Sequence, residues 1–206
     1  MRLVADNLTL LRGEDVVLHG LSFDVASGSA LVITGENGTG KSTLLRGIAG
    51  LLPIEAGTVG LADKPEEFGE ASLEELCHYL GPDNSMKGAM SVGENLAFWQ
   101  DFAGQPFYEI EEALEMVGLG GLSSIPFSHL STGMRRRASI ARLLISYRPI
   151  WLLDEPTSGM DAVSQKQFAD LMGAHLEDGG IVIAATHISL GLDNMQSLVL
   201  DGASLS

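Results

Sequence analysis

Residues 35–42 read Gly35-Glu36-Asn37-Gly38-Thr39-Gly40-Lys41-Ser42, between an apolar run at 30–34 and a segment at 41–50 with apolar residues at helical spacing. A strand, a glycine-rich loop and a helix in this order are typical of a phosphate-binding loop. Glycines let successive backbone N–H groups point at phosphate oxygens, and the start of the helix adds positive dipole potential. Lys41 can then reach the β- and γ-phosphates, and the Ser42 hydroxyl can ligate Mg²⁺. A glycine-rich turn without a ligand is the alternative, and the complete strand, loop, Lys-Ser and helix pattern argues against it.

A second motif supplies acids for the same chemistry. Residues 150–155 are four apolar residues followed by Asp154 and Glu155, which predicts a buried strand ending in two carboxylates. Asp154 is expected to hold Mg²⁺ through water, and Glu155 to polarise the attacking water. Alone the motif is weak, because buried strands often end in acids that cap the next element. Together with the phosphate-binding loop it predicts hydrolysis of a nucleoside triphosphate.

Composition limits the remaining possibilities. The chain has 206 residues with 12 basic and 27 acidic side chains, a formal charge of −15, which suits one domain and argues against a nucleic-acid-binding face. One cysteine, Cys77, excludes a disulfide framework and a cysteine-based zinc site and favours a reducing compartment. No apolar run approaches the length of a membrane span, and the N-terminus has no signal-peptide pattern. We therefore expect a protein of the cytosolic side.

The periodicity along the chain indicates an α/β protein. Strand-like runs are expected at 3–11, 16–25, 58–62, 150–153, 181–185 and 197–201, and helices at 109–117, 131–146 and 163–176. Buried strands alternating with helices predict a sheet covered on both faces. The middle of the chain, approximately 84–148, is helical with irregular breaks, and we interpret it as an inserted helical lobe.

Three further motifs resemble those of ABC-type ATPases, in the same order and over essentially the whole chain. Residues 130–134, Leu-Ser-Thr-Gly-Met, resemble the LSGGQ signature; residues 154–161 resemble the Walker B and D-loop run; Thr186-His187 matches the switch histidine. Taken alone, Ser131 and Gly133 could form an ordinary helix cap, and His187 an ordinary strand end. The resemblance implies an α/β fold with a P-loop NTPase (RecA-like) core, an N-terminal antiparallel β subdomain and an inserted α-helical subdomain, all within one domain, 1–206.

The resemblance also implies a composite site. ATP and Mg²⁺ would be bound by residues 35–43, the last being Thr43, with His187 and Glu155 as catalytic residues. Ser131 and Gly133, with Asp161 nearby, would contact the γ-phosphate held by an opposite protomer, because a helix N-terminus favours an anion. One chain carries one loop and one signature, so a second copy is expected in a head-to-tail sandwich dimer.

Three positions depart from the family pattern. Met134 replaces the final glutamine of the signature. Asp83 stands where a glutamine normally touches Mg²⁺; a carboxylate could do so through water, or Asp83 is a solvated loop residue. Arg12 lies near the place of the aromatic that stacks on adenine, and its guanidinium could stack instead, or it is a surface arginine. These changes leave open a nucleotide-binding regulator that does not hydrolyse ATP.

Within the family, residues 79–81, 94–99, 113–119 and 179–187 resemble the ATP-binding subunits of cytochrome c maturation (haem exporter) complexes, the CcmA type, although that group usually has His-Gln where Pro82-Asp83 stands. The resemblance implies a peripheral subunit on the cytoplasmic face of the bacterial inner membrane, paired with a polytopic membrane subunit. ATP turnover would drive release or export of haem-loaded chaperone or haem, with no direct cargo binding and no nucleic acid. The membrane subunit would dock near residues 83–98, in a groove that apolar residues could line, although such residues by default pack in a core: Met86, Met90, Leu96, Phe98 and Trp99. The alternatives are the ATPase subunit of another small ABC exporter or importer, or a soluble, non-transport ABC ATPase.

Overall fold

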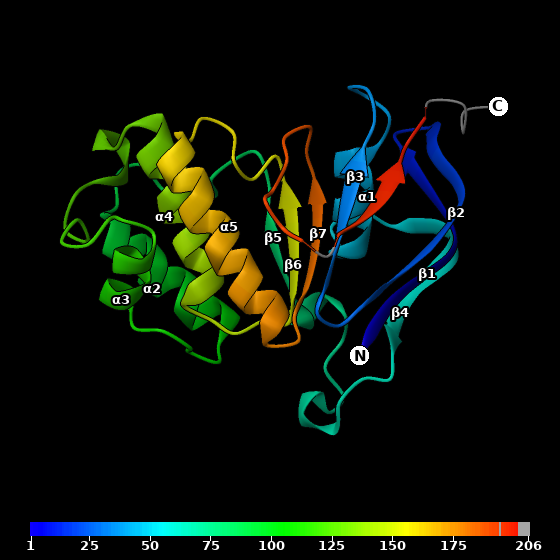
Figure 1. Ribbon diagram of the computed structural model, residues 1–206, viewed down its shortest axis with the longest axis horizontal. Coiled ribbons are helices and arrows are strands. Elements are labelled where there is room, and N and C mark those ends of the chain that lie inside the picture. Colours follow the sequence, from blue (N-terminus) through cyan, green and yellow to red (C-terminus); the bar gives the residue numbers. More distant parts are fainter. Residues whose placement is uncertain (194, 202–206) are drawn as a thin grey trace.

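The computed structural model describes residues 1–193 and 195–201, which form two sheets and five α-helices (Figure 1). A three-stranded antiparallel sheet has the order β2-β1-β4, from Asp15–Ala26, Arg2–Arg12 and Ile54–Ala62. A five-stranded sheet has the order β5-β6-β7-β3-β8, from Cys77–Leu80, Ile150–Asp154, Ile181–Ala185, Ser29–Thr34 and Met195–Val199. All of its strand pairs are parallel, so the predicted α/β class is confirmed.

Two layers cover the parallel sheet (Figure 1). Helices α4 (Thr132–Leu144) and α5 (Ala162–Glu177) cover one face, with α2 (Val92–Ala103) and α3 (Ile110–Met116) beyond them. Helix α1 (Lys41–Ile48) and the antiparallel sheet lie on the other face. Short 3₁₀ turns occur at Glu66–Phe68, Glu74–Leu76 and Phe127–His129.

The central strands β6 and β7 are buried at every position and are almost wholly apolar, because both of their faces are covered. In β6, Trp151 and Leu153 contact the core beneath α4 and α5, whereas Ile150 and Leu152 contact the core beneath α1. Phe168 of α5 is 1% exposed in the first of these cores. The alternation of side chains along a strand therefore explains how one continuous apolar run serves two cores.

Helix starts follow their capping residues. Ser91 accepts the N–H of Glu94, whose carboxylate accepts the N–H of Ser91, and this capping box begins α2. Ser131 caps α4 and Asp161 caps α5 in the same manner, each accepting a backbone N–H of the first turn. The caps thus set the orientation of the helices that flank the signature.

Two expected boundaries differ in the structure. The strand expected at 58–62 begins at Ile54, because β1 pairs with it as far as Ile54. The final strand, expected at 197–201, is Met195–Val199 and pairs with β3. The extent of the inserted lobe at about 84–148 remains a prediction; this segment contains α2, α3 and α4. None of the helices in the described ranges is long and apolar enough to cross a bilayer.

Candidate nucleotide-binding and hydrolysis site

The loop between β3 and α1 has a backbone that requires glycine at two positions. Gly35 has φ +145° and Gly40 has φ +99°, conformations that other residues rarely adopt. A Cβ on Gly40 would lie 2.7 Å from Cγ1 of Val17, and a Cβ on Gly35 would clash with the carbonyl oxygen of Leu200. The loop is therefore held tightly between α1, β2 and the segment after β8.

The loop carries donors suited to a triphosphate. The ammonium of Lys41 lies inside it, with Nζ 2.7 Å from the carbonyl oxygen of Gly35 and 2.9 Å from that of Glu36. The first N–H groups of α1 have no intrahelical partner, and no hydrogen bond within the described residues uses the N–H of Gly38 or Gly40. A cation, a helix N-terminus and free N–H groups together fit a polyphosphate. Lys41 and Ser42 lie at the start of α1, and their contacts with phosphate and Mg²⁺ stay predictions.

Asp154 lies at the carboxyl end of β6, buried, and is held by side chains that the sequence analysis missed. The Tyr79 hydroxyl donates to Oδ2 of Asp154 across 3.4 Å, and Nε of Arg46 donates to the Tyr79 hydroxyl across 3.3 Å. The hydrogen bond that Arg46 donates to Tyr79 raises the pKa of Arg46, and the charges of Asp154 and Asp83 add to this. The chain Arg46–Tyr79–Asp154 links α1, β5 and β6, so it fixes the carboxylate relative to the loop.

Glu155 is held in a left-handed conformation, with φ +44°. Its N–H donates to the carbonyl oxygen of Ala185 across 2.9 Å. Its Oε2 accepts from the Thr186 hydroxyl at 3.4 Å, and its Oε1 lies 3.9 Å from Nε2 of His187. The structure therefore brings Glu155 and His187 together, with both side chains partly open to solvent, and their catalytic roles stay predictions.

Magnesium fits the donors at this edge. Among the described residues no cluster of three or more His, Cys, Asp or Glu could hold a metal ion by itself. Mg²⁺ commonly uses one or two protein ligands together with water and substrate phosphates. Ser42 and Asp154 would supply such ligands. Asp83 is exposed on the loop after β5, and its charge raises the pKa of Arg46. The contact of Asp83 with Mg²⁺ stays a prediction.

The signature lies on a separate surface. A Cβ on Gly133 would approach the carbonyl oxygen of Gly159 to 3.1 Å, so the start of α4 packs against the segment before α5. Ser131 and Asp161 are exposed. Within the described residues no hydrogen bond or ion pair joins Ser131, Gly133 or Asp161 to residues 35–43. The signature and the phosphate-binding loop of one chain are therefore not bonded to each other within the described residues.

Of the three arginines that follow the signature, Arg136 is buried and Arg137 is partly buried. The Arg136 side chain is 4% exposed and binds four backbone carbonyls, while Arg137 donates to the carbonyls of Val117 and Gly118. A run of three arginines in a sequence is typical of a solvated face, so only the packing reveals this role.

Arg12, at the end of β1, is exposed opposite Asp15, and its stacking on adenine stays a prediction.

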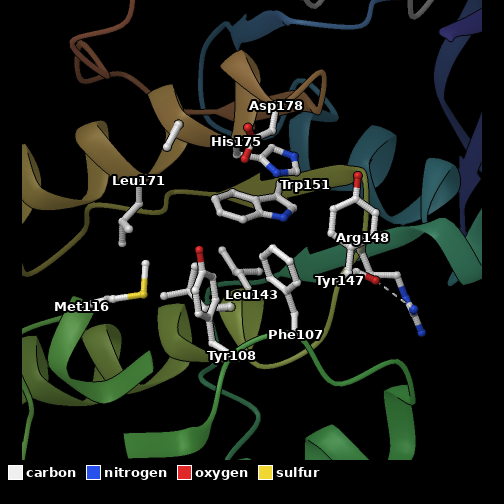
Figure 2. Close-up of a pocket in the computed structure, with 12 residues that line it drawn as sticks. Phe107, Tyr108, Met116, Leu143, Tyr147, Arg148, Trp151, Leu171, His175 and Asp178 are labelled. Carbon is white, nitrogen blue, oxygen red and sulfur yellow. Dashed lines mark hydrogen bonds between the residues drawn. The ribbon is translucent and has the colours of Figure 1, made fainter. Parts of the chain in front are cut away.

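A cavity of about 60 Å³ lies elsewhere, near the amino end of β6 (Figure 2). Its walls include Trp151 and His175, whose rings stack with centroids 4.0 Å apart, and Phe107 and Tyr108 opposite them. Asp154 and the phosphate-binding loop lie at the carboxyl ends of the strands instead. The cavity is therefore separate from the site that the sequence predicts.

A family model described as "ABC transporter" matches residues 18–158. The chain belongs to the ABC transporter family. This ABC protein is 54% identical over 198 residues to the "Cytochrome c biogenesis ATP-binding export protein CcmA" of Chelativorans sp. (strain BNC1), with 96% of this chain and 97% of the relative covered. It is 53% identical to the protein of the same name from Mesorhizobium japonicum, covering 95% and 96% of the two chains.

Solved structures share the fold of this ABC ATPase. A putative ABC transporter ATP-binding protein from Pyrococcus furiosus superposes with a TM-score of 0.81 at 24% identity, covering 97% of this chain and 98% of the other. A dimeric ATP-binding cassette, solved in a post-hydrolysis state with ADP and phosphate, gives 0.81 at 23% identity, covering 97% and 94%. The predicted fold, membership of the ABC ATPases and binding of ATP are thereby confirmed.

Proposed function

We propose that two copies of this ABC ATPase close head to tail around two molecules of MgATP. Each phosphate-binding loop would hold a triphosphate, and the signature of the partner copy would cap its γ-phosphate. The exposed Ser131 at the N-terminus of α4, not bonded to the loop of its own chain, supports this arrangement because a helix N-terminus stabilises an anion brought to it. Asp161 would contact the same nucleotide across the interface.

In the proposed hydrolysis, Lys41 neutralises the β- and γ-phosphates, while Ser42 and Asp154 hold Mg²⁺. When bound, the metal stabilises charge that develops on the phosphate oxygens. Glu155 accepts a hydrogen bond from the attacking water and takes up its proton. His187, 3.9 Å from the Glu155 carboxylate, orients that carboxylate and contacts the γ-phosphate.

The grouping of Glu155, Thr186 and His187 at the carboxyl ends of β6 and β7 is the observation on which this proposal rests. Glu155→Gln keeps the shape of the side chain but removes its basicity. We expect this variant to bind ATP normally, to lose turnover by about 100-fold or more, and to elute as a dimer with ATP. Glu177→Gln, an exposed acid at the end of α5, is the matched control. Normal turnover in the Glu155 variant would contradict the assignment.

We infer further that the chain serves a cytochrome c biogenesis complex that releases or exports haem-loaded chaperone or haem. The relatives at 54% and 53% identity are named cytochrome c biogenesis ATP-binding export proteins, and they match over nearly the whole chain. The protein would then lie on the cytoplasmic face of the inner membrane, bound to a polytopic membrane subunit. Identifying the membrane protein that copurifies in detergent tests this, because another exporter or importer would bring a different partner.

Helix α2 of this chain carries a candidate docking surface for the membrane subunit. Phe98 is 48% and Phe102 74% exposed, their rings stacked 6.3 Å apart, and Lys87 lies over the Phe98 ring at 5.3 Å. One residue of the predicted groove was wrong: Leu96 is fully buried in the core. Whether Leu96 is exposed depends on which face of α2 packs inward, and the sequence does not determine that face. Phe102→Ser should weaken copurification with the membrane subunit and leave ATP binding unchanged.

A further inference from the structure

The buried guanidinium of Arg136 gathers the backbone around the acids of β6. Its Nε donates to the carbonyl oxygen of Pro156 at 2.8 Å, and its Nη1 to that of Gly81 at 2.6 Å. Its Nη2 donates to the carbonyl oxygens of Asp154 and Glu155, both at 2.9 Å. One side chain of α4 thus joins the end of β5 to three consecutive residues, the last residue of β6 and the two that follow it.

These hydrogen bonds act on the peptide groups that flank Glu155. The peptide before its Cα is held at both ends, since the N–H of Glu155 binds Ala185 and the carbonyl of Asp154 binds Arg136. The peptide after it is held through the Glu155 carbonyl, again by Arg136. Fixing both peptide planes fixes φ and ψ between them. Those angles determine where the Glu155 side chain leaves the backbone.

The conformation that is fixed in this way needs support. A non-glycine residue at φ +44° is strained by about 1–3 kcal/mol and persists only when its surroundings determine it. A guanidinium offers five N–H donors in a rigid plane, whereas a lysine offers one flexible ammonium. Arg136 makes its contacts with carbonyl oxygens, and no ion pair among the described residues involves it. Its geometry is therefore specific to the turn at residues 154–156.

We propose that Arg136 is a positioning residue for ATP hydrolysis, which holds the backbone of Glu155 so that its carboxylate faces the attacking water. The inference rests on the role proposed above for Glu155. Because Arg136 lies on the helix that begins at the signature, the same helix presents the cap of one nucleotide and supports the acid that acts on the other.

The test compares Arg136→Lys with Arg142→Lys in the full-length chain. Arg142 is also buried on α4, 7% exposed, but it donates to the carbonyl of Tyr79 and stacks on Trp99, away from Glu155. Both variants should lose some thermal stability. Only Arg136→Lys should lower kcat, by about 10- to 100-fold, with affinity for trinitrophenyl-ATP within about twofold of the unchanged chain. Arg142→Lys should keep its kcat within about twofold.

A second arm separates this inference from the function on which it rests. Glu155→Gln alone should form an ATP-dependent dimer in gel filtration, and the double variant with Arg136→Lys should form it equally well. A kcat near normal in Arg136→Lys, or loss of the dimer in the double variant, would overturn the positioning role. Failure of Glu155→Gln itself to dimerise would overturn the proposed function instead. If Arg136→Lys does not fold, Arg136→Gln is measured in the same way, and failure of both to fold assigns Arg136 to the framework alone and refutes the inference.

Discussion

Lowering the pH from 7.5 to 5.5 should reduce the free energy of unfolding by about 3 kcal/mol, because two partly buried histidines have lowered pKa values in the folded protein. On β5, Nε2 of His78 lies 2.7 Å from the carbonyl oxygen of Ser146. On α5, His175 stacks against Trp151 at the edge of the cavity (Figure 2). Burial lowers the pKa of His78 to about 3 and that of His175 to about 4.

The sign and size follow from the unfolded chain, in which a histidine has a pKa of about 6.5. Since both pKa values are lower in the folded protein, the free energy of unfolding is highest above pH 6.5, where both states hold these histidines neutral. It decreases as the pH falls from 6.5 toward 4, because in this range only the unfolded chain takes up protons. A pH of 5.5 lies one unit below the pKa of the unfolded chain, so each histidine lowers the free energy of unfolding by about 1.4 kcal/mol. The two histidines together lower it by about 3 kcal/mol.

Urea unfolding followed by circular dichroism at pH 7.5, 6.5 and 5.5 measures this loss. His78→Gln and His175→Gln should each remove about half of the pH dependence, and His129→Gln, an exposed residue, should leave it unchanged. A free energy of unfolding that stays constant between pH 7.5 and 5.5, or that falls equally in the double histidine variant, would refute the reasoning.

Three further substitutions test the loop and the core. Lys41→Ala should abolish measurable heat of ATP binding in calorimetry, and unchanged affinity would defeat the assignment of the phosphate-binding loop. Gly40→Ala should lower the free energy of unfolding by about 1–2 kcal/mol because of the positive φ, and further because of the 2.7 Å approach to Val17, and it should weaken ATP binding. Gly13→Ala, with open space around it, should show only the part that comes from the positive φ. Phe168→Ala should lower the free energy of unfolding by about 3–5 kcal/mol, against about 0.5 kcal/mol or less for the exposed Val163→Ala, and equal losses would contradict the packing described.

The phosphate-binding loop and the strand 150–154 could be predicted because their signals are local. Eight consecutive residues fix the loop, since glycine, lysine and serine act there through their own backbone and side-chain chemistry. The apolar run of β6 predicts a strand buried on both faces wherever that strand is placed. Leu96 shows the opposite case. An apolar residue on a helix is buried or exposed according to the neighbours of that helix, and those neighbours are distant in the sequence.

The amino-acid sequence by itself determined the family and the order of strands and helices, and it predicts the residues that would meet the phosphates, because each depends on short-range patterns. The tertiary structure alone decided how the acids are held. Tyr79 reaches Asp154, and Arg136 reaches the carbonyls beside Glu155, only because the strand order places β5 next to β6 under α4. Backbone carbonyls are the same in every residue, so no sequence pattern marks those that a buried arginine will bind.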